Sequence, residues 1–205
     1  MKKILVLFFV ALFLSAPRLS AQIGFDFGMN YEFLSSKAPE GYKATGFGMG
    51  PYIGIIYGIP VTMSSAVNIG LNYKYDILWG APGAWRDEKK LDPFTLLNVD
   101  TDIKEHHLQI PVTYFRSVGI FSLSAGPVFD YCLASTISNL PGGGKADTIK
   151  DLGMKPFNIY LKAGAGIGMK IFSFNLTASY GILDLMPDKQ GLHRLTVGMD
   201  MHLNF

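Results

Sequence analysis

The sequence contains a single cysteine, Cys132, in 205 residues. An intramolecular disulfide is therefore excluded, and no Cys/His spacing typical of a zinc site is present. We expect no bound metal and no cofactor, and we expect Cys132 to be an inert small residue.

Charge is also scarce, at 17% of the residues, whereas soluble globular domains average about 25%. The mean hydropathy is positive, at +0.25, which suggests a large apolar surface facing something other than water. Lys2, Lys3 and Arg18 are the only charged residues among the first 21, so the rest of the chain carries 15 basic and 16 acidic residues. No basic stripe remains, and nucleic acid is not an expected partner.

Long apolar runs are missing after residue 14, which leaves no candidate for a membrane-spanning helix. The start of the chain has a basic pair, an apolar core over residues 4–14 and small residues up to Ala21, as secretory signals do. We expect residues 1–21 to be a signal peptide removed on export, and residues 22–205 to form one domain. The next residue is Gln22, so the cysteine of a lipoprotein anchor is missing.

Abundant aromatic residues and glycines, by contrast, follow a period of two in eight segments. One side of each segment is bulky and aromatic, while the other holds Gly, Ser, Asn and charged residues. This is the pattern of a barrel wall in lipid. A soluble barrel would need its Phe and Tyr inside and its Gly and Ser outside. We therefore predict an all-β fold, an eight-stranded antiparallel up-and-down transmembrane β-barrel after the cleaved signal peptide. The segments are 23–33, 46–57, 66–77, 107–114, 121–131, 158–167, 172–180 and 194–205.

The links between these segments alternate between short and long, as expected for periplasmic turns and extracellular loops. The long loops at 78–102 and 132–156 are the expected contact surface for an extracellular or envelope partner. Pro51, Pro111 and Pro127 fall inside segments, where each removes a ladder hydrogen bond, so bulges or local widening are expected there.

The inward face of the predicted barrel gathers charged side chains, which must pair if they are buried. A salt-bridged plug that closes the lumen is one interpretation, and a narrow polar pore or proton path is the other. Gly164, Gly166 and Gly168 alternate along one strand and are expected to leave room for neighbouring inward side chains. The predicted polar network of the lumen is Asp26, Glu32, Lys74, Asp76, Glu105, Asp130, Lys162, Arg194 and Asp200.

The four histidines, His106, His107, His193 and His202, are candidate catalytic bases, because some small outer-membrane barrels act on lipid A through a serine near a histidine and an acid. Neither His193 nor His202 is followed by serine two positions later. His106 and His107 are not expected to form a metal pair, because adjacent residues face opposite sides of a strand. We predict no catalytic residues and no enzymatic activity.

The chain resembles the outer-membrane β-barrel family common in Bacteroidetes, often labelled PorT-like or porin-family. The resemblance rests on the Ala21-Gln22 boundary, the stretch 24–28 (GFDFG), His107–Val112 followed by Tyr114, Ala125-Gly126-Pro127 and the final Phe205. It implies an eight-stranded outer-membrane barrel, and the PorT label implies a role in protein secretion that no residue here supports.

We expect an integral protein of the cell outer membrane, surrounded by its lipid, with a structural or surface-interaction role and a lumen closed by polar side chains. The alternatives are a lipid-modifying barrel enzyme, a narrow pore, a secretion-associated barrel and a soluble secreted ligand-binding barrel. The sequence does not specify an oligomeric state.

Overall fold

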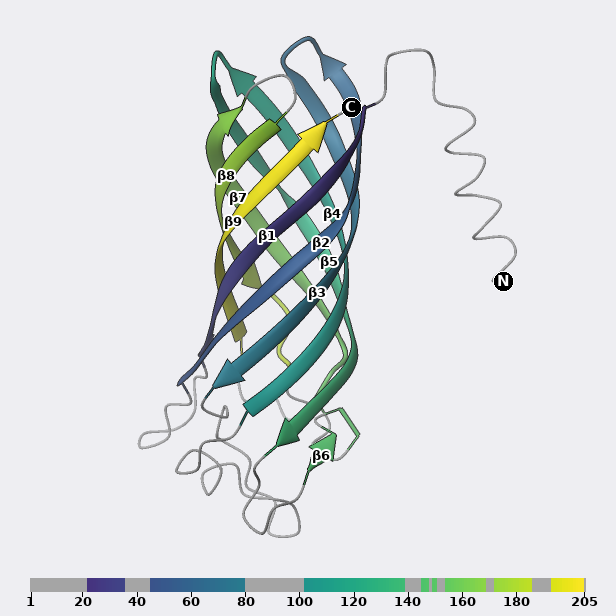
Figure 1. The fold of residues 1–205 in the computed structure, drawn as a ribbon, viewed down its shortest axis with the longest axis vertical. Helices are drawn as coiled ribbons and strands as arrows, with labels where there is room; N and C mark the ends of the chain where they lie inside the picture. The colour runs from purple at the N-terminus through teal and green to yellow at the C-terminus, as the bar shows by residue number, and fades with distance from the viewer. Residues whose placement is uncertain are drawn as a thin grey trace, which may run out of the picture.

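The computed structural model describes residues 22–35, 45–79, 102–138, 145–147, 149–150, 154–168, 172–185 and 193–204. These residues form one antiparallel barrel of tilted strands (Figure 1). No α-helix long and apolar enough to cross a membrane occurs among them. The strands are β1 (Gln22–Ser35), β2 (Thr45–Thr62), β3 (Ser65–Trp79), β4 (Asp102–Val118), β5 (Phe121–Ser138), β6 (Ala146–Asp147), β7 (Phe157–Gly168), β8 (Phe172–Gly181) and β9 (His193–Asn204).

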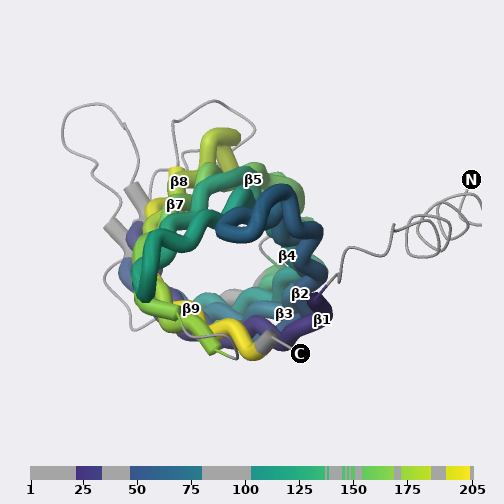
Figure 2. The backbone as a smooth tube through the Cα atoms, turned by 90° about the horizontal axis from the view of Figure 1, so that it is seen from above, coloured from purple at the N-terminus to yellow at the C-terminus, as the bar shows by residue number. Residues whose placement is uncertain are grey.

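Eight long strands close the barrel, since β1 pairs with both β2 and β9, and β4 pairs with β5. Figure 2 shows the closed ring from one end. The two-residue strand β6 adds to the edge of β5 through the pairs Thr136–Asp147 and Ile137–Ala146. Every neighbouring pair is antiparallel, which confirms the predicted eight-stranded antiparallel barrel. The expected signal peptide, residues 1–21, lies outside the described residues.

The two ends of the barrel differ in their connections. Tight turns at Met63–Ser64 and Gly119–Ile120 lie at the same end as Gln22 and Asn204, and Gly119 has a positive φ of 65°. We call this end the turn side. The opposite end, where the connections 36–44, 80–101 and 186–192 leave the strands, is the loop side.

Alternation of side chains follows the predicted parity. On β8, exposed Phe174, Leu176 and Tyr180 alternate with buried Ser173, Asn175 and Thr177, and the other strands behave alike. Leu176 exposes 59% of its surface although it lies in the middle of a strand. The outer face is therefore apolar around the barrel, and the inner face is polar.

Several predicted boundaries were wrong, because the strands extend beyond the segments that the alternation marks. The fourth segment, predicted as 107–114, is β4 with 17 residues. The loop predicted over 132–156 begins as strand, since β5 continues to Ser138, and it contains β6. Residues 78 and 79 likewise belong to β3. Extended strands continue past the membrane wherever their backbone groups still find ladder partners.

Ladder pairing is lost beside the three prolines, as predicted, but the predicted bulges do not occur there. Strand pairing is interrupted between β2 and β3 beside Pro51, between β3 and β4 beside Pro111, and between β4 and β5 beside Pro127. In each case pairing resumes in the same register, so the ladder is interrupted without a bulge. The register shifts lie elsewhere, between Pro60 and Thr62 and at His106/His107.

Glycines on the inner face of β7 make room for their neighbours, as predicted. A Cβ atom at Gly164 would lie 2.8 Å from Ser124 Oγ and from Thr177 Cγ2. At Gly166 it would lie 2.7 Å from the Cα of Asn175. Small residues on β7 therefore let the side chains of β5 and β8 fill the lumen.

Candidate functional site

The interior of the barrel collects the charged residues of the strands. Eight of the nine residues in the predicted network expose at most 3% of their surface, and the side chain of the ninth, Lys162, exposes 17%. All nine lie on the inner face. They form two groups, one toward each end of the barrel.

The larger group, which we call the loop-side cluster, centres on Arg194 of β9. The guanidinium Nη2 donates to Glu105 Oε2 at 2.6 Å, and Nη1 lies 3.2 Å from Glu32 Oε2. Lys74 forms ion pairs with Glu32 and with Asp76, the second at 2.8 Å. The loop-side cluster consists of Glu32, Lys74, Asp76, Glu105, His107, Asp130 and Arg194.

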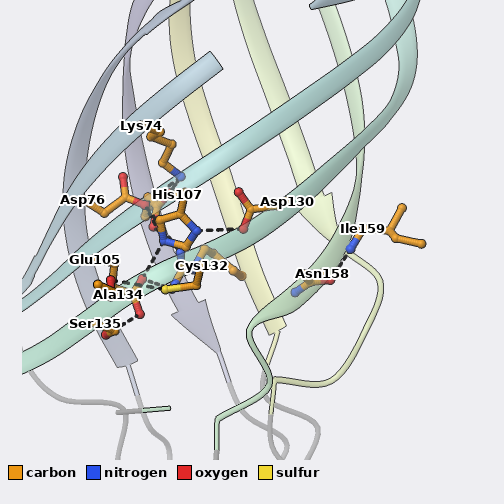
Figure 3. Close-up of polar contacts among 12 residues, drawn as sticks. Lys74, Asp76, Glu105, His107, Asp130, Cys132, Ala134, Ser135, Asn158 and Ile159 are labelled. Carbon is orange, nitrogen blue, oxygen red and sulfur yellow. Dashed lines mark hydrogen bonds and ion pairs between the residues drawn. The ribbon is translucent and has the colours of Figure 1, made fainter. Parts of the chain in front are cut away.

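His107 is the member of this cluster that the predicted network did not include. Its Nδ1 lies 2.8 Å from Asp130 Oδ2, and its Nε2 lies 3.2 Å from Glu105 Oε2 (Figure 3). Asp76 Oδ2 is 3.4 Å from the same Nε2. His107 lies two residues from Glu105 on the same strand and therefore shares its inward face. This alternation was the sequence feature that could have added His107 to the predicted network.

The smaller group, the turn-side cluster, surrounds Asp26 of β1. Asn72 Nδ2 donates to one carboxylate oxygen at 2.8 Å, and Tyr52 Oη donates to the other at 3.2 Å. His202 Nδ1 lies 3.1 Å from the same oxygen as Tyr52. Lys162 pairs with Asp200 and lies 5.7 Å from the ring centre of Tyr52. The turn-side cluster consists of Asp26, Tyr52, Asn72, Lys162, Asp200 and His202.

Cavities of different size lie along the described part of the lumen. A cavity of about 30 Å³ lies between the two clusters, with Lys74, Tyr160 and Lys162 in its lining. A cavity of this size can hold ordered water. A larger space of about 330 Å³, the vestibule, is lined by Gln22, Asn68 and His202 near the turn side. The described part of the lumen therefore narrows from the vestibule to ion-paired side chains.

Apolar side chains lie inside the barrel on the loop side of the ion pairs. Leu78 and Ile103 are cross-strand partners that expose only 1% and 3% of their surfaces. Met154 and Leu185 are also buried, and both line a space of about 10 Å³ beside His107. Backbone hydrogen bonds from Cys132 N to Pro156 O and from Lys155 N to Leu185 O hold these segments in place. This apolar layer covers the loop-side cluster.

The histidines do not form a nucleophile–base pair with any serine in the described ranges. Both nitrogens of His107 face carboxylates, and His106 Nδ1 lies 2.5 Å from the hydroxyl of Tyr73 on the outer face. His193 Nδ1 lies 3.0 Å from the carbonyl oxygen of Gly181. Ser135 Oγ donates to Glu105 rather than to an imidazole. His202 is the cross-strand partner of Ser173, and its Nδ1 lies 3.1 Å from Asp26 Oδ1. Ion pairs and hydrogen bonds therefore make up most of the polar part of the described lumen.

Comparisons with known proteins agree with this architecture. Neisserial surface protein A (NspA) is similar in structure, with a TM-score of 0.58 and 10% sequence identity over 91% of this chain and 99% of that one. Ail, the attachment invasion locus protein of Yersinia pestis, solved in complex with the heparin analogue sucrose octasulfate, gives a TM-score of 0.51 at 10% identity, over 91% of this chain and all of the other. Identities this low show the fold alone. No curated protein matches the chain in sequence.

A family model described as the outer membrane protein beta-barrel domain matches residues 15–186. That match covers most of the sequence and spans the strands from β1 to β8. The outward apolar face, the polar interior and the similar solved barrels are all consistent with it. This chain belongs to the outer membrane protein β-barrel domain family.

Proposed function

We propose that this protein is a closed outer-membrane barrel that acts through its wall and its extracellular loops, with a structural or surface-interaction role. The observation that carries the proposal is the interior. Seven charged or ionisable side chains from five strands fill the loop-side half of the described lumen, and the cavities beside them measure about 30 Å³ and 10 Å³. A barrel of eight strands has just enough interior for its side chains, so a packed network obstructs solute flow.

The loops supply the surface. Short periplasmic turns and longer extracellular loops are usual for this class, so the proposal has the loop side outside the cell and the turn side in the periplasm. A partner would then meet the connections around 78–102 and 132–156. Within 132–156, the structure describes a polar turn that follows β6. The backbone N–H groups of Lys150 and Ile149 donate to the Asp147 carboxylate in this turn. These bonds hold the pKa of that carboxyl below its usual range. That a barrel of the same fold, Ail, was solved with a polysulfated ligand supports a surface-interaction role.

The finer parts of the proposal rest on the sequence. Residues 1–21 would be removed on export by their signal-peptide pattern. The Leu108–Pro111 stretch and Ala125-Gly126-Pro127 support a place among PorT-like barrels of Bacteroidetes. We infer no enzymatic activity, because the described histidines face carboxylates, a tyrosine hydroxyl or a backbone carbonyl.

A planar lipid bilayer tests the closed lumen. The refolded protein should give no stable conductance steps, whereas an open porin reconstituted in parallel gives them. Regular steps in the purified wild-type protein would contradict the proposal and support the narrow-pore alternative.

Cysteine labelling on intact cells tests the orientation. In a Cys132→Ser background, Lys145→Cys on the loop side should react with a maleimide too large for porins. Met63→Cys, in a fully exposed tight turn, is the matched control and should react only after the outer membrane is permeabilised. The reverse pattern would contradict the orientation, and equal labelling of both in a detergent-free soluble fraction would support a soluble barrel instead.

A further inference from the structure

We propose that the loop-side half of the lumen contains a divalent-metal site, with zinc as the metal that its ligands suit best. The ligands are Glu105 and His107 of β4 and Cys132 of β5, all three buried. Their ligand atoms lie within 4.8 Å of one another. Figure 3 shows the three side chains together on the inner face of the barrel.

The set of donor atoms favours zinc. A thiolate, an imidazole and a carboxylate are the three side-chain ligands that zinc takes in proteins, at bond lengths of about 2.0–2.3 Å. Ligand atoms around a tetrahedral ion are then about 3.3–3.8 Å apart, so the trio must close by roughly 1 Å. Magnesium and calcium prefer sites made of oxygen alone, which a thiol does not provide.

His107 is already oriented as a metal ligand. Its Nδ1 lies 2.8 Å from Asp130 Oδ2, so an Nδ1–H can be donated to that carboxylate. Nε2 lies 3.2 Å from Glu105 Oε2 and 3.4 Å from Asp76 Oδ2, and zinc would replace the proton that Nε2 shares with them. Nε2 is the nitrogen that faces Glu105. A carboxylate that fixes the second nitrogen of a histidine is the usual outer support of a metal site. Asp130 is therefore a positioning residue for the ligand.

A β-bulge lies directly beside the ligands. The pairing between β4 and β5 shifts by one residue at this point, since His106 pairs with Ala134 while His107 pairs with Cys132. Leu133 and Ala134 are both exposed, so the strand returns to its inward parity at Ser135. Ser135 Oγ then donates to Glu105 Oε1 at 3.3 Å. Bulges of this kind are frequent where a sheet re-aims side chains at a site.

Space and charge also suit a cation. The cavity of about 10 Å³ is lined by all three ligands and by Asp130. The loop-side cluster holds four carboxylates but only two permanent cations, Lys74 and Arg194. With a neutral His107 the cluster therefore carries two uncompensated negative charges, which are costly to bury. A divalent ion together with the Cys132 thiolate would reduce this excess to one. Arg194 and Lys155 also line the cavity. Arg194 contacts Glu105 through Oε2, and Oε1 remains available on the side of Ser135.

Zinc binding would release the thiol proton of Cys132, because the thiolate is the form that coordinates the metal. Since ion pairs and the apolar layer surround the site in the described lumen, zinc is expected to enter while the barrel folds.

The test is to refold the exported chain into detergent micelles with Zn²⁺ present, remove loosely bound metal with a weak chelator and measure retained zinc by mass spectrometry. We expect one zinc per barrel, and with Co²⁺ an intense near-ultraviolet thiolate-to-cobalt band. Cys132→Ser should abolish the band and the retained zinc, and Asp130→Asn should weaken binding about 10–100-fold. His107→Asn should also lose zinc, whereas the matched control His106→Asn, one residue away on the outer face, should keep it.

Heat-dependent gel migration shows which variants have folded. A folded wild-type barrel that retains no zinc overturns the proposal. So does retention that is equal in wild type and Cys132→Ser, because the metal would then be bound elsewhere. If His107→Asn does not fold, the cobalt band and the conservative Cys132→Ser variant still decide the question.

Discussion

On the loop side of the lumen, four carboxylates and three bases from five strands contact one another beneath an apolar layer. On the turn side, a smaller group around Asp26 is satisfied mainly by neutral donors and opens onto a vestibule of about 330 Å³. Both groups use the same inward parity of the same strands. The difference indicates that the loop-side side chains block the lumen, while the turn-side side chains can be in contact with water.

The loop-side cluster should be the costlier one to break. Arg194→Met keeps the side-chain volume but leaves Glu105 and part of Glu32 without their cation. Removing one partner of a buried ion pair costs about 3–5 kcal/mol. Urea unfolding in lipid vesicles, followed by tryptophan fluorescence, measures the loss. If Arg194→Met lowered the free energy of unfolding by less than Lys162→Met does, the turn-side cluster would be the more important of the two.

The corresponding change on the turn side is Lys162→Met, which removes the partner of Asp200. Thr177 Oγ1 still donates to Asp200 at 3.3 Å, and the lysine side chain is 17% exposed. Because water and a hydroxyl can compensate, we expect a smaller loss of about 1–3 kcal/mol by the same unfolding assay. The variant should also stay non-conducting in planar bilayers, since the loop-side cluster is intact. Conductance in this variant would place the closure on the turn side.

Tyr52→Phe sharpens the comparison within the turn-side cluster. It deletes the hydroxyl that donates to Asp26 and keeps the ring beside Lys162. Asn72 remains bonded to the carboxylate, so the loss should be about 0.5–1.5 kcal/mol. A loss as large as that of Arg194→Met would show that the hydroxyl is essential to the whole lumen.

The smallest effect is expected outside the lumen. Lys150 pairs with Asp147 at 3.6 Å, and its side chain is 82% exposed. Solvated pairs of this type contribute about 0–1 kcal/mol, so Lys150→Ala should leave the unfolding midpoint almost unchanged. A clear change in the urea midpoint of unfolding would mean that the turn after β6 stabilises the barrel.

Much of the fold and of the interior could be predicted because a strand alternates its side chains with a period of two. Phe174 and Asn175, for example, are assigned to opposite faces by their positions alone. The same rule marks Asp26 and Glu32 as inward. It could not show that His107 bridges Asp130 and Glu105, because contacts across the lumen depend on register and barrel closure. It also failed beyond Cys132, where the bulge changes the parity of the strand.

The sequence by itself determined which side chains face lipid and which face the lumen, since adjacent residues of any extended strand point in opposite directions. It also determined the number of strands and the alternation of short and long connections. Only the tertiary structure decided which inward residues meet. Arg194 and Glu105 are 89 positions apart and come into contact because the sheet closes and its strands tilt. Cys132 and His107 share a site for a similar reason: the register of β4 against β5 makes them cross-strand partners, and the extra residue beyond Cys132 brings Ser135 to Glu105.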